Sequence, residues 1–388
     1  MTIPSGGTGA DFGNLSTTNR GYLSGASSST RGLFGGGYTT SPSAATVNVI
    51  DYIEIGTLGN ALDFGDMFTG RYSSGAVSNG VRAVWGGGMG NAPTSNTGTR
   101  SVIDYVTIAS KGDSIKFGDL TAARRMLAES ACSNNVRGIF AGGYRDPNNH
   151  ASANIDYIEI STEGNAVDFG DLTGNHDMMH CGLSNSTRGI FAGGEMPSAP
   201  SGTNTIQYVT IAALGAAQDF GDLLRNTKES AGCASPTRGI IFGDGLGEIQ
   251  YITISTLGNA IDFGDHIFNS LAASCSDSTR GMIGGGTSLI TGGTINTIQY
   301  VTITTLGNAQ DFGDLTHARS ELSAVSNSIR GVFAGGSSEG NRIDYITIQT
   351  TGNAQDFGDL PTSGNSQEQG SASDSHGAVS YTHLRAHE

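Results

Sequence analysis

Short runs of small, apolar and β-branched residues alternate with turns of Gly, Asn and Ser along most of the chain. In one stretch these runs are Glu321–Ser326, Arg330–Ala334, Ile343–Ile348 and Ala354–Phe357. β-Branched and aromatic residues favour strands, and Gly and Asn tolerate the positive φ of tight turns. No long segment has the 3.6-residue periodicity of an amphipathic helix. The pattern predicts an all-β chain built from groups of four short antiparallel strands.

This four-strand pattern recurs along the chain. An Asp-Phe-Gly triplet, once replaced by Lys-Phe-Gly, marks each copy at intervals of 43 to 53 residues. Its phenylalanines are Phe12, Phe64, Phe117, Phe169, Phe220, Phe263, Phe312 and Phe357. Four strands in a unit of about 50 residues are typical of a β-propeller blade. We therefore predict a β-propeller of about seven four-stranded blades, with the phenylalanines filling the seams between blades.

The repeats also define the expected domain boundaries. Residues 1–360 are predicted to form the propeller, with seven repeat units preceded by a lone outer strand at 9–15. Residues 361–378 resemble the start of a truncated eighth unit, so the array is either an incomplete set of eight or seven units that close by themselves. In the first case the strand at 9–15 would complete a final blade. Residues 379–388 resemble a translated sequencing adapter, and we exclude them from the fold.

The order of the recurring residues within each unit resembles that of a kelch-type repeat. An Arg opens the first strand at Arg20, Arg71, Arg319 and, one residue out of phase, Arg125; di-glycine ends the second strand, and a Tyr lies in the third. Phe stands where kelch repeats have Trp. The resemblance covers residues 10 to 360 and implies a kelch-like propeller. Similar repeats occur in large proteins of tailed, including marine, bacteriophages.

Composition and charge exclude several classes of protein. The chain has 60 glycines, 14% charged residues and a formal net charge of −15. Such a field repels nucleic acid and anionic bilayers, so we expect no nucleic-acid partner and no membrane insertion. Neither a signal peptide nor an apolar run of membrane-spanning length is visible. Four cysteines do not make a disulfide framework, and Cys132, Cys233 and Cys275 share a strand position that predicts small buried thiols; Cys181 lies in the equivalent strand, outside that register.

Two polar features recur in nearly every unit and are expected to be structural. The first is the Arg that begins each second strand, and the second is the pair of Asp residues around each seam Phe, as in Asp63 and Asp66. Inter-hairpin salt bridges between these groups are one interpretation. The other is that each Asp caps its own turn through an Asx motif.

Binding residues are expected on one face of the ring. The loops between second and third strands differ in length and chemistry from unit to unit, and such variation on a rigid scaffold is typical of a binding surface. Tyr, Met and Arg favour interfaces. The candidate contact residues are Tyr38, Met89, Tyr144, Arg145, His150 and Met196. The alternative is that these loops are simply solvated and tolerant of change.

Catalytic and metal sites have weak support. His176 and His180 have helix-like ligand spacing, but on a strand they would lie too far apart and lack further ligands. The kelch resemblance implies one alternative, a galactose-oxidase-like copper site that uses histidines of the loop face. The candidate histidines for that site are His150, His176, His266 and His317. No local motif joins them, so we expect no cofactor, no metal and no enzymatic activity.

The sequence thus favours a non-enzymatic structural or binding propeller. We expect a protein or carbohydrate surface ligand, and a role as a tail-fibre or adhesin-like component of a phage virion, present in the host cytoplasm before release. The alternatives are the kelch-type metal enzyme and an intracellular propeller that binds other proteins.

Overall fold

The structure is a computed structural model of the chain. It describes residues 22–39, 45–57, 60–90, 98–126, 130–145, 150–176, 181–199, 201–227, 230–243, 247–267, 269–288, 290–320, 322–336, 342–359 and 372–373. The predicted lone strand at 9–15, Arg20 and the adapter-like segment 379–388 lie outside these residues.

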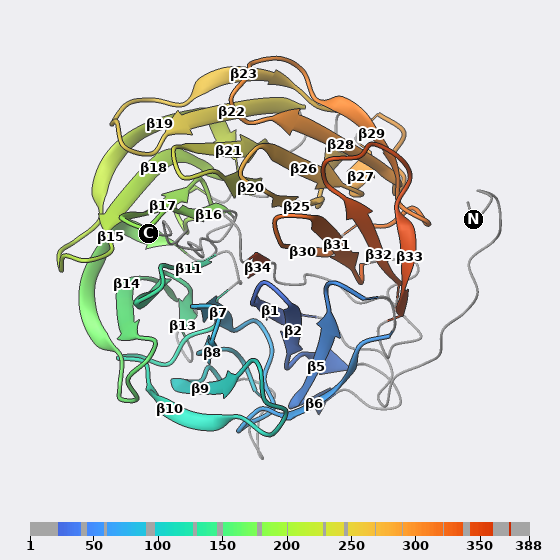
Figure 1. The fold of residues 1–388 in the computed structure, drawn as a ribbon. Coiled ribbons are helices and arrows are strands. Elements are labelled where there is room, and N and C mark those ends of the chain that lie inside the picture. Colours follow the sequence, from blue (N-terminus) through green and yellow to red (C-terminus); the bar gives the residue numbers. More distant parts are fainter. Residues whose placement is uncertain are drawn as a thin grey trace, which may run out of the picture.

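Seven four-stranded antiparallel sheets form the blades of a β-propeller, as predicted, and all the described regular structure is β (Figure 1). Blades 1 to 7 follow chain order. The first strands lie at the centre of the ring: β1 (Ser24–Ser27), β7 (Gly75–Ser78), β11 (Ala131–Ser133), β16 (Cys181–Ser184), β20 (Ala231–Ala234), β25 (Ala273–Ser276) and β30 (Ser323–Ser326). The second strands are β2 (Arg31–Gly35), β8 (Arg82–Gly86), β12 (Arg137–Ala141), β17 (Arg188–Ala192), β21 (Arg238–Phe242), β26 (Arg280–Gly284) and β31 (Arg330–Ala334).

The outer half of each blade is a hairpin of the third and fourth strands. The third strands are β5 (Val49–Glu54), β9 (Val102–Thr107), β14 (His150–Glu159), β18 (Thr203–Thr210), β22 (Glu248–Thr253), β28 (Thr297–Thr302) and β32 (Arg342–Thr347). The fourth strands are β6 (Leu62–Asp66), β10 (Ile115–Asp119), β15 (Val167–His176), β19 (Gln218–Thr227), β23 (Ile261–Asp265), β29 (Gln310–Asp314) and β33 (Gln355–Asp359). Short additional strands are β3 (Tyr38–Thr39), β4 (Ala45–Thr46), β13 (Tyr144–Arg145), β24 (Asn269–Ser270), β27 (Thr287–Ser288) and β34 (Ala372–Ser373).

Blades 3 and 4 depart from the expectation of short strands. β15 and β19 each have ten residues, against five in the fourth strands of the other blades. Their pairing with β14 and β18 continues beyond the bulge at the Asp-Phe-Gly triplet. The outer hairpins of these two blades therefore extend further than the others.

The ring closes with seven blades, each formed by contiguous residues. β33 supplies the fourth strand of blade 7 from within the same unit. Across the closing seam, Arg330 Nη1 donates to the carbonyl of Ile55 at 3.0 Å and Asn327 Nδ2 donates to the carbonyl of Ser29 at 3.1 Å. Of the two predicted closures, the structure has the one in which seven units close by themselves.

A separate hydrophobic cluster fills each of the seven seams between neighbouring blades. The Phe of each blade is buried there, and its ring packs edge-on against the Tyr of the third strand, as in Tyr208 and Phe220 at 5.9 Å. The pairs are Tyr52–Phe64, Tyr105–Phe117, Tyr157–Phe169, Tyr208–Phe220, Tyr251–Phe263, Tyr300–Phe312 and Tyr345–Phe357. The predicted role of the phenylalanines is confirmed.

A small residue near the start of each second strand receives a side chain from the previous blade. A Cβ added to Gly281 would lie 2.7 Å from Cys233 Sγ, and one added to Gly239 would lie 2.6 Å from Leu183 Cδ1. Blade 2 has Ala83 at this position, and the facing residue of blade 1, in the same cluster, is the small Ala26. The larger residue Ala83 is thus accommodated by a smaller residue, Ala26, in the neighbouring blade.

The Gly281→Ala substitution is expected to lower the free energy of unfolding by about 1–3 kcal/mol, because the new methyl group overlaps Cys233 Sγ. The double variant Gly281→Ala/Cys233→Ala should recover most of this loss, since it recreates the Ala26–Ala83 arrangement. Urea denaturation of the single and double variants measures both effects. Additive losses in the double variant would contradict the proposed fit.

The Arg that begins each second strand joins its blade to the next one. Its guanidinium lies over the Tyr ring of its own third strand, at 4.3 to 5.0 Å, and its Nη1 donates to a backbone carbonyl of the following blade. The donors and acceptors are Arg31–Ile108, Arg82–Ile160, Arg137–Ile211, Arg188–Ile254, Arg238–Ile303, Arg280–Ile348 and Arg330–Ile55. The predicted salt bridges between these arginines and the Asp residues flanking Phe are wrong for the described residues.

Four of the Asp residues that precede a seam Phe accept a local bond of the Asx type, which the alternative interpretation predicted. The amide of Gly170 donates to Asp168 Oδ1 at 3.0 Å, and the same bond recurs at Asp219, Asp262 and Asp356. The outer strand is also held by the next blade, whose turn donates Gly258 N to the carbonyl of Phe220 at 2.8 Å. Because these bonds use the outer edge, they cover part of a surface that could otherwise pair with another strand.

Candidate functional site

Two sets of connections meet on one face of the ring, which we call the loop face. One set joins second to third strands within a blade, and the other joins each fourth strand to the first strand of the next blade. Di-glycine at the end of the second strand brings them together: Gly37 N donates to the carbonyl of Arg71 at 2.8 Å, and Gly88 N donates to that of Arg124 at 2.9 Å. A Cβ at Gly36, which has a φ of +71°, would lie 2.3 Å from the Arg71 carbonyl oxygen. Glycine is therefore required at this contact.

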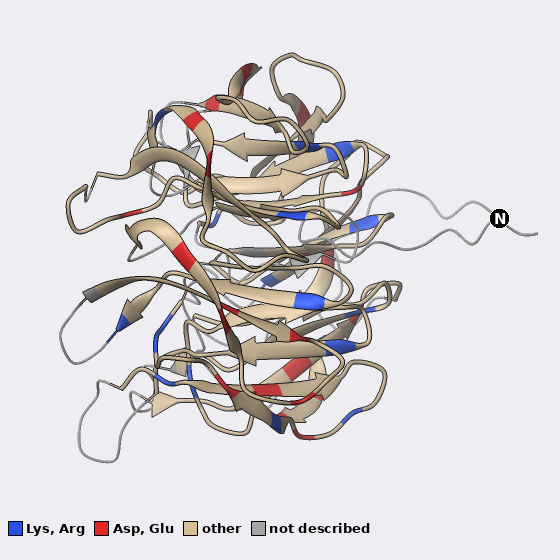
Figure 2. Cartoon of the chain, turned by 90° about the vertical axis from the view of Figure 1, so that its left-hand side faces the viewer, with Lys and Arg blue, Asp and Glu red and all other residues tan. Residues whose placement is uncertain are grey.

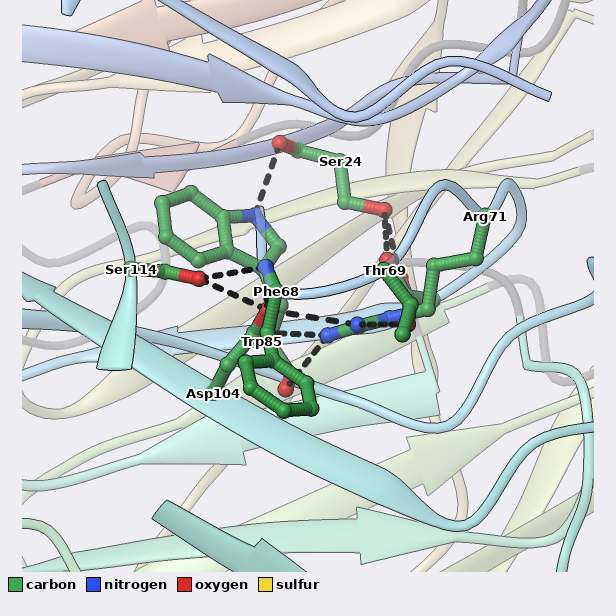
Figure 3. Close-up of polar contacts among 8 residues, drawn as sticks. Ser24, Phe68, Thr69, Arg71, Trp85, Asp104 and Ser114 are labelled. Atoms are coloured by element: carbon green, nitrogen blue, oxygen red, sulfur yellow. Dashed lines mark hydrogen bonds and ion pairs between the residues drawn. The ribbon is translucent and has the colours of Figure 1, made fainter. Parts of the chain in front are cut away.

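A buried ion pair fixes the connection between blades 1 and 2 (Figure 3). Arg71 and Asp104 are both completely buried and form a salt bridge through Arg71 Nη2. The same Nη2 donates to the carbonyl of Trp85 at 3.1 Å, and Asp104 Oδ2 accepts from Ser114 Oγ and from the amide of Phe68, each at 2.9 Å. This network ties the incoming chain to the second and third strands of blade 2.

The same network recurs in blades 3 and 7. Arg124 pairs with Asp156, and Arg319 pairs with Asp344, each at 2.9 Å with both side chains buried. Burial lowers the pKa of Arg124, while Asp156 acts in the opposite direction. The repeat-based choice of Arg125 is wrong: Arg124 takes the inward position, at the same spacing from its seam Phe as Arg71 and Arg319, and Arg125 lies on the loop face.

Blades 4, 5 and 6 replace the buried carboxylate with an amide. Gln207, Gln250 and Gln299 occupy the position of Asp104 in their third strands and accept an incoming backbone amide at 2.7 to 2.8 Å. In blade 4, His176 occupies the place of the arginine, and its Nε2 accepts from Gln207 Nε2 at 2.9 Å. His176 ends β15 rather than entering a first strand, which corrects the prediction for this segment.

Burial lowers the pKa of His176 to about 4. The unfolded chain therefore binds an extra proton between about pH 6.5 and 4, and stability should fall as the pH falls through that window, by at most about 1.4 kcal/mol per unit. The variant His176→Gln should show a shallower loss over the same range. Denaturation midpoints measured from pH 7 to 4 test this; parallel curves would contradict it.

Aromatic side chains gather on the loop face at blades 1 and 2. The ring of Tyr72 lies 5.6 Å from that of Tyr22 and 5.2 Å from that of Tyr38, and the Tyr72 hydroxyl contacts Met89 Sδ at 2.8 Å. Tyr22, Tyr38 and Tyr72 are partly exposed, whereas Met89 is 8% exposed. The structure thus brings together two predicted residues, Tyr38 and Met89, with two that the sequence analysis did not select.

The cluster continues onto blade 3. Arg125 and Tyr144 exchange two backbone hydrogen bonds, and the guanidinium lies 4.5 Å from the ring centre of Tyr144. Tyr38, Met89 and Tyr144 each follow the di-glycine of their blade, whereas blades 4 and 6 have Glu195 and Thr287 there. We call Tyr22, Tyr38, Tyr72, Met89, Arg125 and Tyr144 the Tyr–Arg arc.

The remaining predicted residues lie outside this arc. Arg145 is exposed and donates to Asn154 Oδ1 at 3.4 Å. The backbone of His150 pairs with Arg145, and its side chain is outside the described part of the structure. Met196 packs on β15, where a Cβ at Gly174 would lie 2.5 Å from Met196 Cε, so it has a packing role.

Tyr22, Tyr72 and Arg125 belong to connections between blades. They were not predicted, because variation in length pointed to the connections within blades. The available signal was that Tyr72 and Arg125 each follow an Arg, Arg71 or Arg124, at the same spacing from its seam Phe.

The described residues contain no group of three or more His, Cys, Asp or Glu placed to hold a metal ion. All four cysteines are buried, which confirms the prediction for Cys132, Cys233 and Cys275, and burial raises the pKa of Cys132 to about 12. Among the same residues no helix is both long and apolar enough to cross a bilayer. In Figure 2 acidic and basic residues are scattered over the ring.

The fold therefore defines the class of the protein, a seven-bladed β-propeller of contiguous four-stranded units. No known family model matches the chain, and no curated protein sequence matches it.

Proposed function

We propose that this propeller is a non-enzymatic binding protein whose ligand contacts the loop face over blades 1 to 3. The observation that carries this proposal is the Tyr–Arg arc: partly exposed rings and a guanidinium occupy equivalent or adjoining positions in three consecutive blades. Tyr, Met and Arg are the residues enriched at binding interfaces. The seams repeat from blade to blade, whereas the arc is confined to one part of the ring.

The proposed ligand is a surface protein or a surface carbohydrate. Tyr rings present flat apolar faces to sugar rings or side chains while their hydroxyls donate hydrogen bonds. Arg145, exposed beside Tyr144, adds a cation at the edge of the arc. These groups bind and orient a ligand without requiring a reactive centre.

A panel of immobilised bacterial surface polysaccharides and outer-membrane proteins tests binding. The arc variant Tyr38→Ser/Tyr72→Ser is expected to bind at least about tenfold more weakly than the unmodified chain, since aromatic anchors dominate interface energies. Val81→Ser/Ile329→Ser is the matched control, because both residues are 62% exposed and lie in turns between first and second strands, on the opposite face. Equal loss in both variants, or binding that survives the arc variant, would contradict the proposal.

A more specific role is as a tail-fibre or adhesin-like component of a phage virion. It is supported by the resemblance of the kelch-type repeats to those of large phage proteins and by the display of differing loops on a repeated frame. The genomic contig that carries this sequence should then encode other virion structural proteins. A neighbourhood of cellular genes would favour an intracellular protein-binding propeller instead.

A further inference from the structure

At the centre of the ring, the seam between blades 7 and 1 has an inner-strand serine whose hydroxyl lacks its expected partner. Around the inner strands, a serine hydroxyl of one blade donates to a carbonyl of the preceding blade, as from Ser78 Oγ to Ser27 O at 2.7 Å. The same bond joins Ser133 to Ser78, Ser184 to Ser133, Ser276 to Ala234 and Ser326 to Ser276. Blade 5 has Ala234 at the position of the serine, so it has no hydroxyl to donate to blade 4. Continuing this series would place a bond from Ser27 Oγ to Ser326 O between blades 1 and 7.

That bond is absent, although Ser27 holds the required position. Its hydroxyl oxygen is buried and has no hydrogen-bond partner in the described structure. A buried hydroxyl without a partner is unfavourable, so its occurrence at one position of a repeated series calls for a local cause.

The cause is a strand that lies between the two blades. β34 pairs in parallel with β30, Ala372 opposite Val325 and Ser373 opposite Ser326, and it also lies against β1. Figure 1 places β34 at the centre of the ring beside β1 and β30. Blades 1 and 7 remain joined further out by Arg330 and Asn327.

The residues of β34 match those of an inner strand. Ala372-Ser373 repeats Ala26-Ser27 at the end of β1 and aligns, residue for residue, with Val325-Ser326 at the end of β30. Small residues suit this place because neighbouring inner strands converge at the axis, and backbone pairing supplies the affinity in strand addition.

We propose that the inner end of the seam between blades 7 and 1 is a strand-binding slot that recognises an extended segment of inner-strand type, and that residues 372–373 of the same chain occupy it. The ring is thus closed by seven blades at its periphery and holds the inner strand of an eighth unit at its centre. This inference is independent of the ligand assigned to the loop face.

Amide hydrogen exchange on the full-length chain tests the slot. Ala372→Pro removes an amide and stiffens the segment, so β30 and β1 are expected to exchange at least about tenfold faster while β16 in blade 4 is unchanged. A synthetic peptide of residues 367–376 should restore slow exchange in this variant. Unchanged exchange in Ala372→Pro would overturn the proposal. If slow exchange of β1 and β30 in the unmodified chain were lost on dilution, the slot would be occupied by a second copy of the chain. That result would overturn occupancy by residues 372–373 of the same chain.

A second pair of variants tests the slot without disturbing residue 372. With the slot filled, Ser27→Ala removes only an unpaired hydroxyl and should leave the melting temperature unchanged or raised. Ser78→Ala removes a hydroxyl that donates at 2.7 Å and should lower it. Equal decreases would show that Ser27 forms the regular bond and that the slot is empty.

Discussion

Replacing Arg71 with methionine is expected to lower the free energy of unfolding by about 3–5 kcal/mol. The variant leaves the Asp104 carboxylate fully buried without its cation, and the remaining donors, the amide of Phe68 and the hydroxyl of Ser114, do not neutralise it. It also removes a donor from the carbonyl of Trp85. The loss should be seen in urea denaturation followed by the fluorescence of Trp85, the single tryptophan of the chain.

The chain itself supplies the compensating change. Blades 5 and 6 have Gln250 and Gln299 where blade 2 has Asp104, and each amide accepts a backbone hydrogen bond without a nearby Arg partner of this kind in the described residues. Arg71→Met/Asp104→Gln should therefore recover most of the stability. Arg225→Met is the control, because Arg225 is 63% exposed and its bridge to Glu248 should contribute less than about 1 kcal/mol. A double variant no more stable than Arg71→Met would refute the interpretation.

The second large effect concerns closure of the ring. Phe357→Ala and Phe220→Ala should each cost about 3–5 kcal/mol, because both rings are 2% exposed and both fill a seam between two blades. Phe220 lies between blades 4 and 5, whereas Phe357 packs with Leu23, Phe34 and Ile53 of blade 1. In an open array Phe357 would face a frayed end, and its removal would matter much less.

Comparing the two denaturation midpoints therefore reports on the closing seam. Phe68→Ala is the control for loss of an aromatic residue, because Phe68 is 56% exposed and is not one of the seam phenylalanines. It should change the free energy of unfolding by less than about 1 kcal/mol. If Phe357→Ala cost under a third of Phe220→Ala, the seven-bladed closure would be wrong.

Much of the fold could be predicted because each signal was repeated seven times. The Phe and the second-strand Arg occupy fixed places in every blade, and the di-glycine does so in every blade but the fifth, so a local ambiguity in one unit was resolved by the others. Where a unit departed from the repeat, prediction failed. Blade 3 has two adjacent arginines. Arg125 was chosen, although Arg124 follows its seam Phe at the spacing of Arg71 and Arg319, and it is Arg124 that is buried beside Asp156. Likewise, β15 and β19 continue through positions at which the fourth strands of the other blades have already ended, and the sequence pattern did not show this.

The candidate site was less accessible from the sequence. Tyr38 and Met89 belong to separate blades, and nothing in their spacing shows that Tyr72 lies between them. Their residue types and their place in variable loops selected the first two, but Met196 satisfies the same criteria and packs on Gly174. Whether a loop side chain is available to a ligand depends on neighbouring blades, which a local pattern does not contain.

The seams between blades have a consequence for how such a gene can change. The Arg of every second strand reaches a backbone carbonyl of its neighbour, and a carbonyl is present whatever residue stands there. Arg71 and Asp104, by contrast, lie within one contiguous segment and are inherited together. Recombination between repeats, with crossovers ahead of that arginine, would exchange whole blades and their loops while leaving the joints intact. New combinations of loops could then arise by shuffling, without redesign of the frame that carries them.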